Sequence, residues 1–425
     1  MTWPMLFGVL SLLSFQLIDS AFIGQLGVLP LAAQGFTLPV QMVVIGVQVG
    51  LGIAITAIVS RALGEDRLNY ARQLSGLSLA LGGIGLAVIS VLLWLLRVPL
   101  LSIMGAEANI FPVIDAYWPW WLVSVWFGAL VYLLSSICRA NGNTMLPGFL
   151  MMAVSGINLV LDPVFIFTLG LGIQGAAIAT IVAFALGLLF MTPKVIKAEW
   201  ISFDWQGMDI KLSLNRISNI MMPAMASQLL PPISAMMATK VLAGFGAAAV
   251  AAWALASRYE FFSIVAVLAL TMSMPPMVGR LLGAKNFSEI DKLMRIAIKF
   301  ILAFQLLVAV LTLLFADLFS GLMTSEDNVE NVLSSFLVLV PFSLGPLGVC
   351  ILVVSISNAL ARPQNALLIS AARLFVFFLP CLWVGAQMGG IQGVFIGAFI
   401  GNCLSGAAAW ISYKRLMAQM SHPQE

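Results

Sequence analysis

The sequence predicts an all-α integral membrane protein whose twelve transmembrane helices form two pseudo-symmetric six-helix lobes. Of its 425 residues, 61% are hydrophobic and only 9% are charged, and the mean hydropathy is +1.07. Soluble domains carry about 25% charged residues, so this composition belongs in a lipid bilayer. The net charge of +3 is small, and nucleic acid is not an expected partner. Two further observations, the apolar runs and an internal repeat, predict the helix number and the lobes.

Apolar runs of transmembrane length occur twelve times along the chain. A helix needs about 20 apolar residues to cross a bilayer core. The runs, divided by polar residues, Gly and Pro, are 3–25, 37–60, 75–96, 116–138, 146–168, 173–193, 217–242, 248–278, 294–316, 332–357, 364–386 and 391–413. Charged and aromatic residues mix in 194–216, which we interpret as a cytoplasmic connector with one surface-lying segment. We therefore expect an N-lobe at 1–193 and a C-lobe with a short tail at 217–425.

The distribution of cations predicts the orientation. Lys and Arg in short loops mark the cytoplasmic side of a membrane protein. Fifteen of the 20 lie in alternate loops or the tail, whereas the opposite loops contain only Arg97. We expect a multi-pass protein of the bacterial inner membrane with both termini in the cytoplasm. The start, "MTWPMLFG", has no basic region or cleavage site and does not resemble a removable signal peptide.

The two halves of the chain repeat at an offset of 219 residues. "FIGQLGVLPLAAQG" from Phe22 aligns with "VLAGFGAAAVAAWA" from Val241, and "VSRALGEDRLNYARQL" from Val59 aligns with "VGRLLGAKNFSEIDKL" from Val278. Six spans per half is an even number, so both halves enter the membrane from the same side. Such parallel repeats are typical of secondary transporters.

The residues of common catalytic and metal sites are scarce. The single histidine, His422, lies in a polar tail, no GxSxG motif is present, and no cysteine belongs to a CxxC motif. The cysteines are Cys138, Cys350, Cys381 and Cys403. We therefore expect neither an enzyme nor a cofactor, and no firmly bound metal.

Three acidic residues, Asp19, Asp162 and Glu260, lie inside predicted spans. A charge at the bilayer centre costs about 2.5 to 3.5 kcal/mol on insertion scales, so each acid needs a partner, a cavity or a proton. Asn158 precedes Asp162 by four residues on the same helix face, and Pro163 removes a backbone donor beside it. These oxygens suit a proton relay or a small hard cation such as sodium. The alternative is that they only tie helices together.

The intramembrane acids Asp19 and Asp162 belong to one half. The offset carries Asp19 onto Ala238 and Asp162 onto Cys381. Glu260, in the other half, is different because Arg258 lies two residues away, so either a structural ion pair or attraction of substrate explains it. Methionines gather around spans seven and eight, among them Met237 and Met274, and suit either an adaptable substrate wall or ordinary packing.

Five stretches together resemble the multidrug and toxic compound extrusion (MATE) family. They are "DSAFIGQLGVLPLAAQG", "SRALGEDRLNYARQ", "RANGNTMLPG", "NLVLDPVFIF" and "GIQGAAIAT", and the likeness covers nearly the whole chain. The acid in the first span and "SRYEFF" in the eighth resemble the DinF-like branch. The resemblance implies two six-helix lobes around a cavity and cation-driven export of amphipathic, often cationic drugs.

The resemblance also assigns roles to particular residues. Asp19 matches the family's first-helix acid, and Asn158 with Asp162 matches its fifth-helix polar pair. Supporting oxygens are implied for Thr180 and Ser135, and a helix-bending role for Pro4.

Two carboxylates in one apolar pocket cannot both ionise cheaply, which gives a hypothesis for coupling. A proton from outside neutralises Asp19, rearranges its hydrogen bonds and releases the drug. Sodium coupling through the same oxygens is one alternative. A lipid-linked precursor flippase is another and would use Lys240, Arg258 and Arg373 as cations. We expect a monomer.

Overall fold

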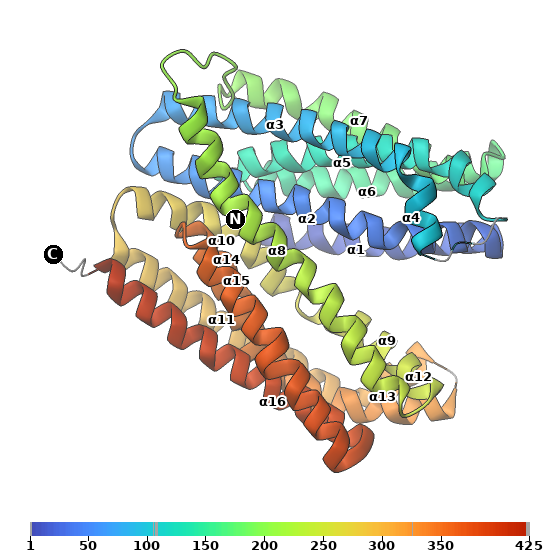
Figure 1. Cartoon of the computed structure of the whole chain (residues 1–425). Helices are drawn as coiled ribbons and strands as arrows, with labels where there is room; N and C mark the ends of the chain where they lie inside the picture. The colour runs from blue at the N-terminus through green and yellow to red at the C-terminus, as the bar shows by residue number, and fades with distance from the viewer. Residues whose placement is uncertain (1, 105, 107–108, 325, 422–425) are drawn as a thin grey trace. The chain divides into compact units, whose positions relative to one another are not determined.

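The computed structural model describes residues 2–104, 106, 109–324 and 326–421, and every regular element in these ranges is helical (Figure 1). His422 lies outside them. The first half contains α1 (Thr2–Gln25), α2 (Val28–Gly64), α3 (Leu68–Leu95), α4 (Arg97–Ile103), α5 (Phe111–Ala140), α6 (Met145–Pro163), the π-helical η1 (Val164–Thr168) and α7 (Gly172–Lys197). The second contains α8 (Ile210–Ala243), α9 (Ala247–Ser263), α10 (Val265–Gly283), α11 (Phe287–Leu314), α12 (Ala316–Met323), α13 (Asp327–Leu339), the 3₁₀ turn η2 (Val340–Ser343), α14 (Leu344–Ala359), α15 (Pro363–Ala371), the π-helical η3 (Ala372–Phe378) and α16 (Leu379–Ser421).

Eleven helical stretches among the described residues are long and apolar enough to cross a membrane. The last of them, Pro363–Met420, contains a reversal at Gly389 and Gly390, where the backbone leaves helical geometry. We call the helical segments before and after this reversal its two legs. A side chain at Gly401 would meet the Cα of Phe378 at 2.9 Å, so the two legs pack side by side. Counting both legs gives twelve crossings, as predicted.

Several predicted boundaries differ from the structure. The connector expected at 194–216 is shorter, because α7 runs to Lys197 and α8 begins at Ile210. Two spans differ most clearly. The second span was expected at 37–60, but α2 begins at Val28 because Pro30 stands in its first turn, where a proline starts a helix as readily as it stops one. The eighth span, expected as one run at 248–278, is two helices, α9 and α10, that meet at Ile264.

The internal repeat is visible in the backbone. Adding 219 to the bounds of α3 gives those of α11, and adding 219 to those of α2 gives the outer bounds of α9 and α10. Positive φ values recur at matching places: Gly27 (109°) and Gly246 (100°), Asp66 (57°) and Lys285 (56°), Gly172 (57°) and Gly390 (58°). Left-handed backbone is unfavourable for most residues, so its recurrence confirms the predicted register.

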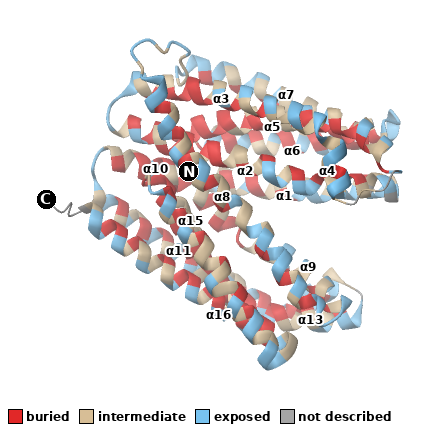
Figure 2. Cartoon of the chain, viewed as in Figure 1, coloured by how far each residue is buried: buried red, intermediate tan, exposed pale blue. Residues whose placement is uncertain are grey.

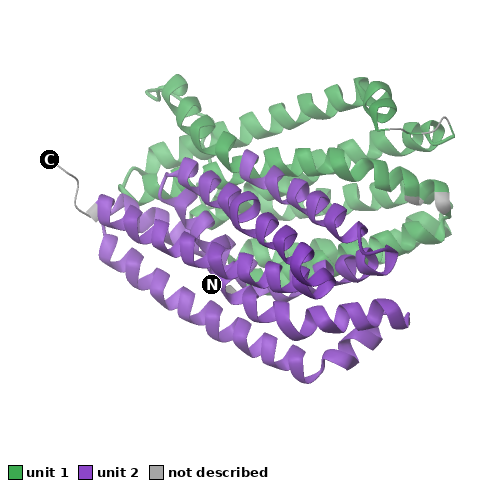
Figure 3. Ribbon diagram, turned by 60° about the horizontal axis from the view of Figure 1, so that its bottom comes forward, with its two compact units in different colours: residues 1–225 green, residues 226–425 purple. Residues whose placement is uncertain are grey.

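The chain forms two compact units, residues 1–225 and 226–425, with the boundary inside α8 (Figure 3). Each has its own apolar core. Buried residues alternate with exposed ones along the helices (Figure 2). Ile114 and Trp118 of α5 are fully buried in unit 1, and Phe336 of α13 and Tyr413 of α16 are fully buried in unit 2.

The segment between α7 and α8 lies against the start of α3. The Gln73 side chain donates to the carbonyl oxygens of Asp204 and Gln206 at 3.0 and 3.2 Å. Arg72 pairs with Glu199 at 2.8 Å, and its carbonyl accepts from the Ser202 amide at 3.0 Å. This part of the predicted connector therefore covers one face of α3.

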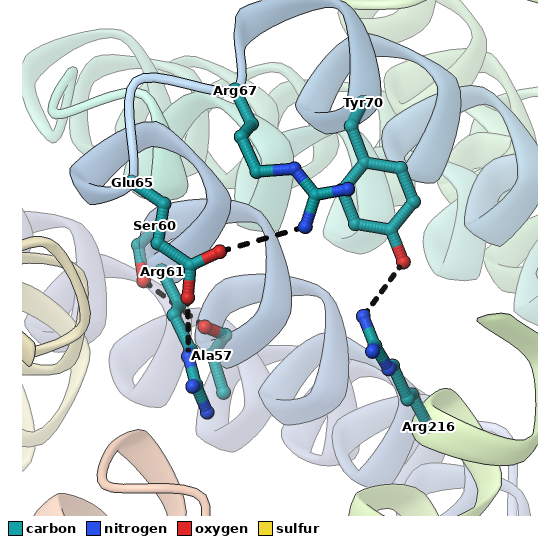
Figure 4. A network of polar contacts seen from close by, with 7 residues as sticks. All are labelled: Ala57, Ser60, Arg61, Glu65, Arg67, Tyr70 and Arg216. Atoms are coloured by element: carbon teal, nitrogen blue, oxygen red, sulfur yellow. Dashed lines mark hydrogen bonds and ion pairs between the residues drawn. The ribbon is translucent and has the colours of Figure 1, made fainter. Parts of the chain in front are cut away.

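A second polar network ties the loop between α2 and α3 to α8 (Figure 4). Glu65 pairs with Arg61 at 2.9 Å and with Arg67 at 3.7 Å. The Arg67 guanidinium stacks over the Tyr70 ring, and the Tyr70 hydroxyl accepts from Arg216 at 3.2 Å. Exposed pairs of this kind contribute about 0 to 1 kcal/mol each, so they position the loop more than they stabilise the unit.

Candidate functional site

A cluster of buried polar side chains lies within unit 1, on α6 and α7. Asn158 and Asp162 are one turn apart on α6, and only 1% and 0% of them is exposed. The Asn158 amide nitrogen lies 3.0 Å from the Thr180 hydroxyl oxygen, and that hydroxyl donates to the Ala176 carbonyl at 2.9 Å. The structure thus joins Asn158 and Thr180 and places Asp162 beside them.

The Asn158 side chain can bridge its neighbours in two orientations, which differ in where the proton must be. With its oxygen toward Asp162, the amide needs a protonated carboxyl group as donor. With the amide turned, its nitrogen donates to the Asp162 oxygens at 2.6 and 3.2 Å, and its oxygen accepts from Thr180 at 3.0 Å. A carboxylate only accepts, whereas a carboxylic acid can donate. The direction of this hydrogen-bond chain therefore depends on whether Asp162 carries a proton.

Asp19 of α1 adds a second carboxyl group to the site. It is half-buried, and its Oδ1 is buried without a hydrogen-bond partner among the described residues. The charge of Asp19 acts on both Asp162 and Tyr117 of α5, so these three groups lie within electrostatic range. A buried carboxylate oxygen without a donor is costly, which favours the uptake of a proton or another cation.

The helix widens directly beyond Asp162. Pro163 ends α6, and the π-helical segment η1 follows, with the Leu169 amide bonded to the Val164 carbonyl at 2.9 Å. Proline removes the amide hydrogen that would continue the α-helical pattern, and π-turns are frequent at functional sites. The sequence therefore places an irregular backbone next to the acid.

Pro4, the residue to which the resemblance gave a bending role, lies in the first turn of α1. This helix is continuous from Thr2 to Gln25. A side chain at Gly148 of α6 would meet the Pro4 Cβ at 2.9 Å, and one at Gly8 would meet the Gly148 carbonyl oxygen at 3.0 Å. The glycines thus hold the start of α1 tightly against α6.

The structure does not bring Ser135 to this site. Ser135 is buried on α5, 18 residues beyond Tyr117, which corresponds to about 27 Å along a helix that rises 1.5 Å per residue. Tyr117 instead lies within electrostatic range of Asp19 and was not singled out from the sequence. An aromatic residue with a hydroxyl group in an apolar span was the available signal, but the span is apolar on every side and does not indicate which face is inward.

The predicted substrate residues of unit 2 lie in different surroundings. Met237 is 48% exposed, whereas Met274 is 3% exposed in the core and presents no surface to a ligand. Arg258 is exposed, and the cation whose charge acts on Glu260 is Arg373 of η3. The ion pairs found in the described part of the chain include neither Arg258 nor Glu260.

The donor set of the unit 1 site bears on the coupling ion. No group of three or more His, Cys, Asp and Glu side chains in the described ranges is placed to hold a metal. A sodium ion would have to use the mixed oxygens of Asp19, Asp162, Asn158 and Thr180, which are the types of ligand that hard cations accept. The same oxygen atoms are sufficient to bind a proton instead of a sodium ion.

Comparison with known proteins identifies the family. The MatE family model matches residues 4–164 and again 223–384, at the offset of the repeat. An FAD transporter of Shewanella oneidensis is 31% identical over 424 residues, covering 98% of this chain and 93% of that protein. The multidrug export protein MepA of Staphylococcus aureus is 24% identical over 420 residues, covering 96% and 91%. The structure of the Vibrio cholerae MATE transporter VcmN in the bent form is similar with a TM-score of 0.97 and 60% identity, covering 99% of this chain and 96% of that one.

Proposed function

This chain belongs to the MATE family of multidrug efflux transporters, and we propose that it is a proton-driven antiporter exporting amphipathic, often cationic drugs. Its family consists of transporters that need no cofactor, so the chain is a multi-pass membrane transporter and not an enzyme. The observation that carries the proposal is the unpaired buried oxygen of Asp19 within electrostatic range of the buried Asp162.

The proposed coupling step begins with a proton bound at Asp19. Neutralising this carboxyl group removes its repulsion of Asp162, and a proton held at Asp162 turns the Asn158 amide. The turn reverses the hydrogen bond to Thr180. A change of charge therefore alters the interactions of α1, α6 and α7 together. Export requires that proton and drug favour different conformations, since a ligand that binds two states equally shifts neither.

Efflux from proteoliposomes under separate ion gradients tests this proposal. We expect a pH gradient without sodium to drive drug efflux, and Asp19→Asn to abolish it while the purified variant stays monodisperse. Ser135→Ala is the matched control, because it removes a buried oxygen that lies far from the site along α5. Undiminished efflux by Asp19→Asn would refute the proposal. Efflux driven by a sodium gradient at equal pH would assign sodium as the coupling ion.

An anionic dinucleotide such as FAD is a second candidate cargo. The relative named as an FAD transporter is 31% identical, and Lys240 and Arg258 of unit 2 are exposed cations within predicted spans. A lipid-linked pyrophosphate would use similar cations, although the multidrug export relatives favour small molecules. Competition between a cationic dye and FAD in the same efflux assay separates the two cargoes, and binding of pyrophosphate lipid would indicate a flippase.

Orientation and assembly complete the proposal. The positions of the cations support an inner-membrane protein with both termini in the cytoplasm, and we propose that it acts as a monomer. A reporter fused to each terminus that is active only in the periplasm tests the first statement. Light scattering of the purified protein tests the second, and a dimer would contradict it.

A further inference from the structure

We infer that the exposed face of α11 near its N-terminal end binds an anionic phospholipid. Lys292, Arg295, Ile296 and Lys299 are separated from one another by three or four residues along one helix face and are all exposed. With Ser288 and Asp291 they line a groove of about 480 Å³, which we call the basic groove.

Positive charge remains in the basic groove after its internal pairs are formed. Asp291 accepts from Arg295 at 2.7 Å and from Lys414 of α16 at 2.9 Å. Lys292 reaches Glu289 at 3.6 Å, and both side chains of this pair are exposed. Lys299 has no ion-pair partner in the described part of the chain. In and around the groove, two acids therefore face four cations, which suits a phosphate group.

The apolar surface next to the groove favours a lipid over a soluble anion. Beyond Lys299 the same face of α11 continues as Leu302, Leu306 and Val310, which are all exposed. A soluble phosphate would need only the cations. A phospholipid needs cations at the end of a span and an apolar strip for its acyl chain directly beside them, which is the order of residues on this face.

The repeat shows how the same face is treated in unit 1. The offset of 219 places Gln73, Gly76 and Ala80 of α3 at the positions of Lys292, Arg295 and Lys299. In unit 1 the connector covers this face, because Gln73 is bonded to Asp204 and Gly76 packs against the Ser202 carbonyl. In unit 2 the matching residues Lys292, Arg295 and Lys299 are exposed. The connector covers this helix face on α3 of unit 1, whereas the matching face of α11 in unit 2 is accessible to a ligand.

Native mass spectrometry of the purified full-length protein tests this site. Phosphatidylglycerol and phosphatidylcholine with identical acyl chains are titrated against the wild type and its variants. We expect the wild type to retain phosphatidylglycerol preferentially, Lys299→Gln to weaken that binding about fivefold, and Lys299→Arg to preserve it. The triple variant K292Q/R295Q/K299Q should lose the preference. Lys211→Gln removes an exposed cation of α8 and is the matched control, which should bind as the wild type does.

Four outcomes would overturn the inference. An unchanged preference in the triple variant would show that the lipid binds elsewhere, and an equal loss in Lys211→Gln would show unspecific attraction. Complete displacement of the lipid by millimolar inorganic phosphate would assign the groove to a soluble anion. A protein dimer that the triple variant dissociates would assign it to a second copy of the chain. Size-exclusion profiles and melting temperatures confirm that each variant is folded.

Discussion

Unit 1 and unit 2 share a backbone plan but differ in the charges they hold inside the membrane. The same helix lengths and the same left-handed positions recur 218 or 219 residues apart. In unit 1 the polar site contains two acids, Asp19 and Asp162, beside Asn158 and Thr180. In unit 2 the position of Asp19 is the fully buried Ala238, and Arg373 lies on η3. Glycines and apolar runs determine the fold of both units, so a few side chains can specialise one of them.

The largest expected effect concerns the two acids of unit 1 that have no acid at the matching positions of unit 2. Replacing Asp162 by Asn keeps the shape of the side chain but removes the ionisable group, and we expect proton-driven efflux to fall to the background of empty liposomes. Replacing the repeat-related Cys381 by Ser should leave efflux within about twofold. Equal losses in both variants would break the distinction between the units, and the assay is dye efflux under a pH gradient.

A smaller effect is expected from the hairpin that ends unit 2. Gly397 packs against the backbone of Cys381, so Gly397→Val must push the two legs apart. Overpacking of this kind costs about 1 to 3 kcal/mol, and the melting temperature of the purified protein should fall. Gly389→Ala is the control, because a Cβ there meets nothing. An unchanged melting temperature for Gly397→Val would contradict the close packing.

The hydrogen bond between α6 and α7 should matter for both stability and transport. Thr180→Val removes the hydroxyl group that bonds Asn158 and leaves a buried amide without this partner, at a cost of about 1 to 3 kcal/mol. Thr180→Ser retains the hydroxyl and should restore both melting temperature and efflux. If Thr180→Val and Thr180→Ser behave alike, the hydroxyl group does not link α6 and α7. Only the carboxyl groups would then be needed at the site.

The smallest effect is expected in the network of Figure 4. Arg216→Gln removes the bond to the Tyr70 hydroxyl, which is exposed and contributes about 0 to 1 kcal/mol. The melting temperature should change by no more than a few degrees, and high salt should reduce the difference. A larger loss would show that the start of α8 supports unit 1 more strongly than its surface pairs indicate.

The sequence was sufficient for the fold and for part of the site. The length of the apolar runs predicted the crossings, and the spacing of Asn158 and Asp162 predicted one polar face, because a helix places residues four apart side by side. Tyr117 was not predicted, and for Met274 the sequence left both a substrate wall and ordinary packing open. Both residues lie in helices that are apolar on all sides, where no periodicity distinguishes the inward face. Ser135 came from family resemblance, which carries no information about distance along α5.

We expect the glycine-lined hairpin of α16 to influence how the protein is inserted into the membrane during synthesis. Its legs touch backbone to backbone through Gly385, Gly393, Gly397 and Gly401. Helices that approach so closely gain van der Waals contact with each other that lipid tails cannot replace. We therefore expect these last two segments to leave the translocon together as a preformed pair, so that neither has to wait in the lipid for the other to be translated.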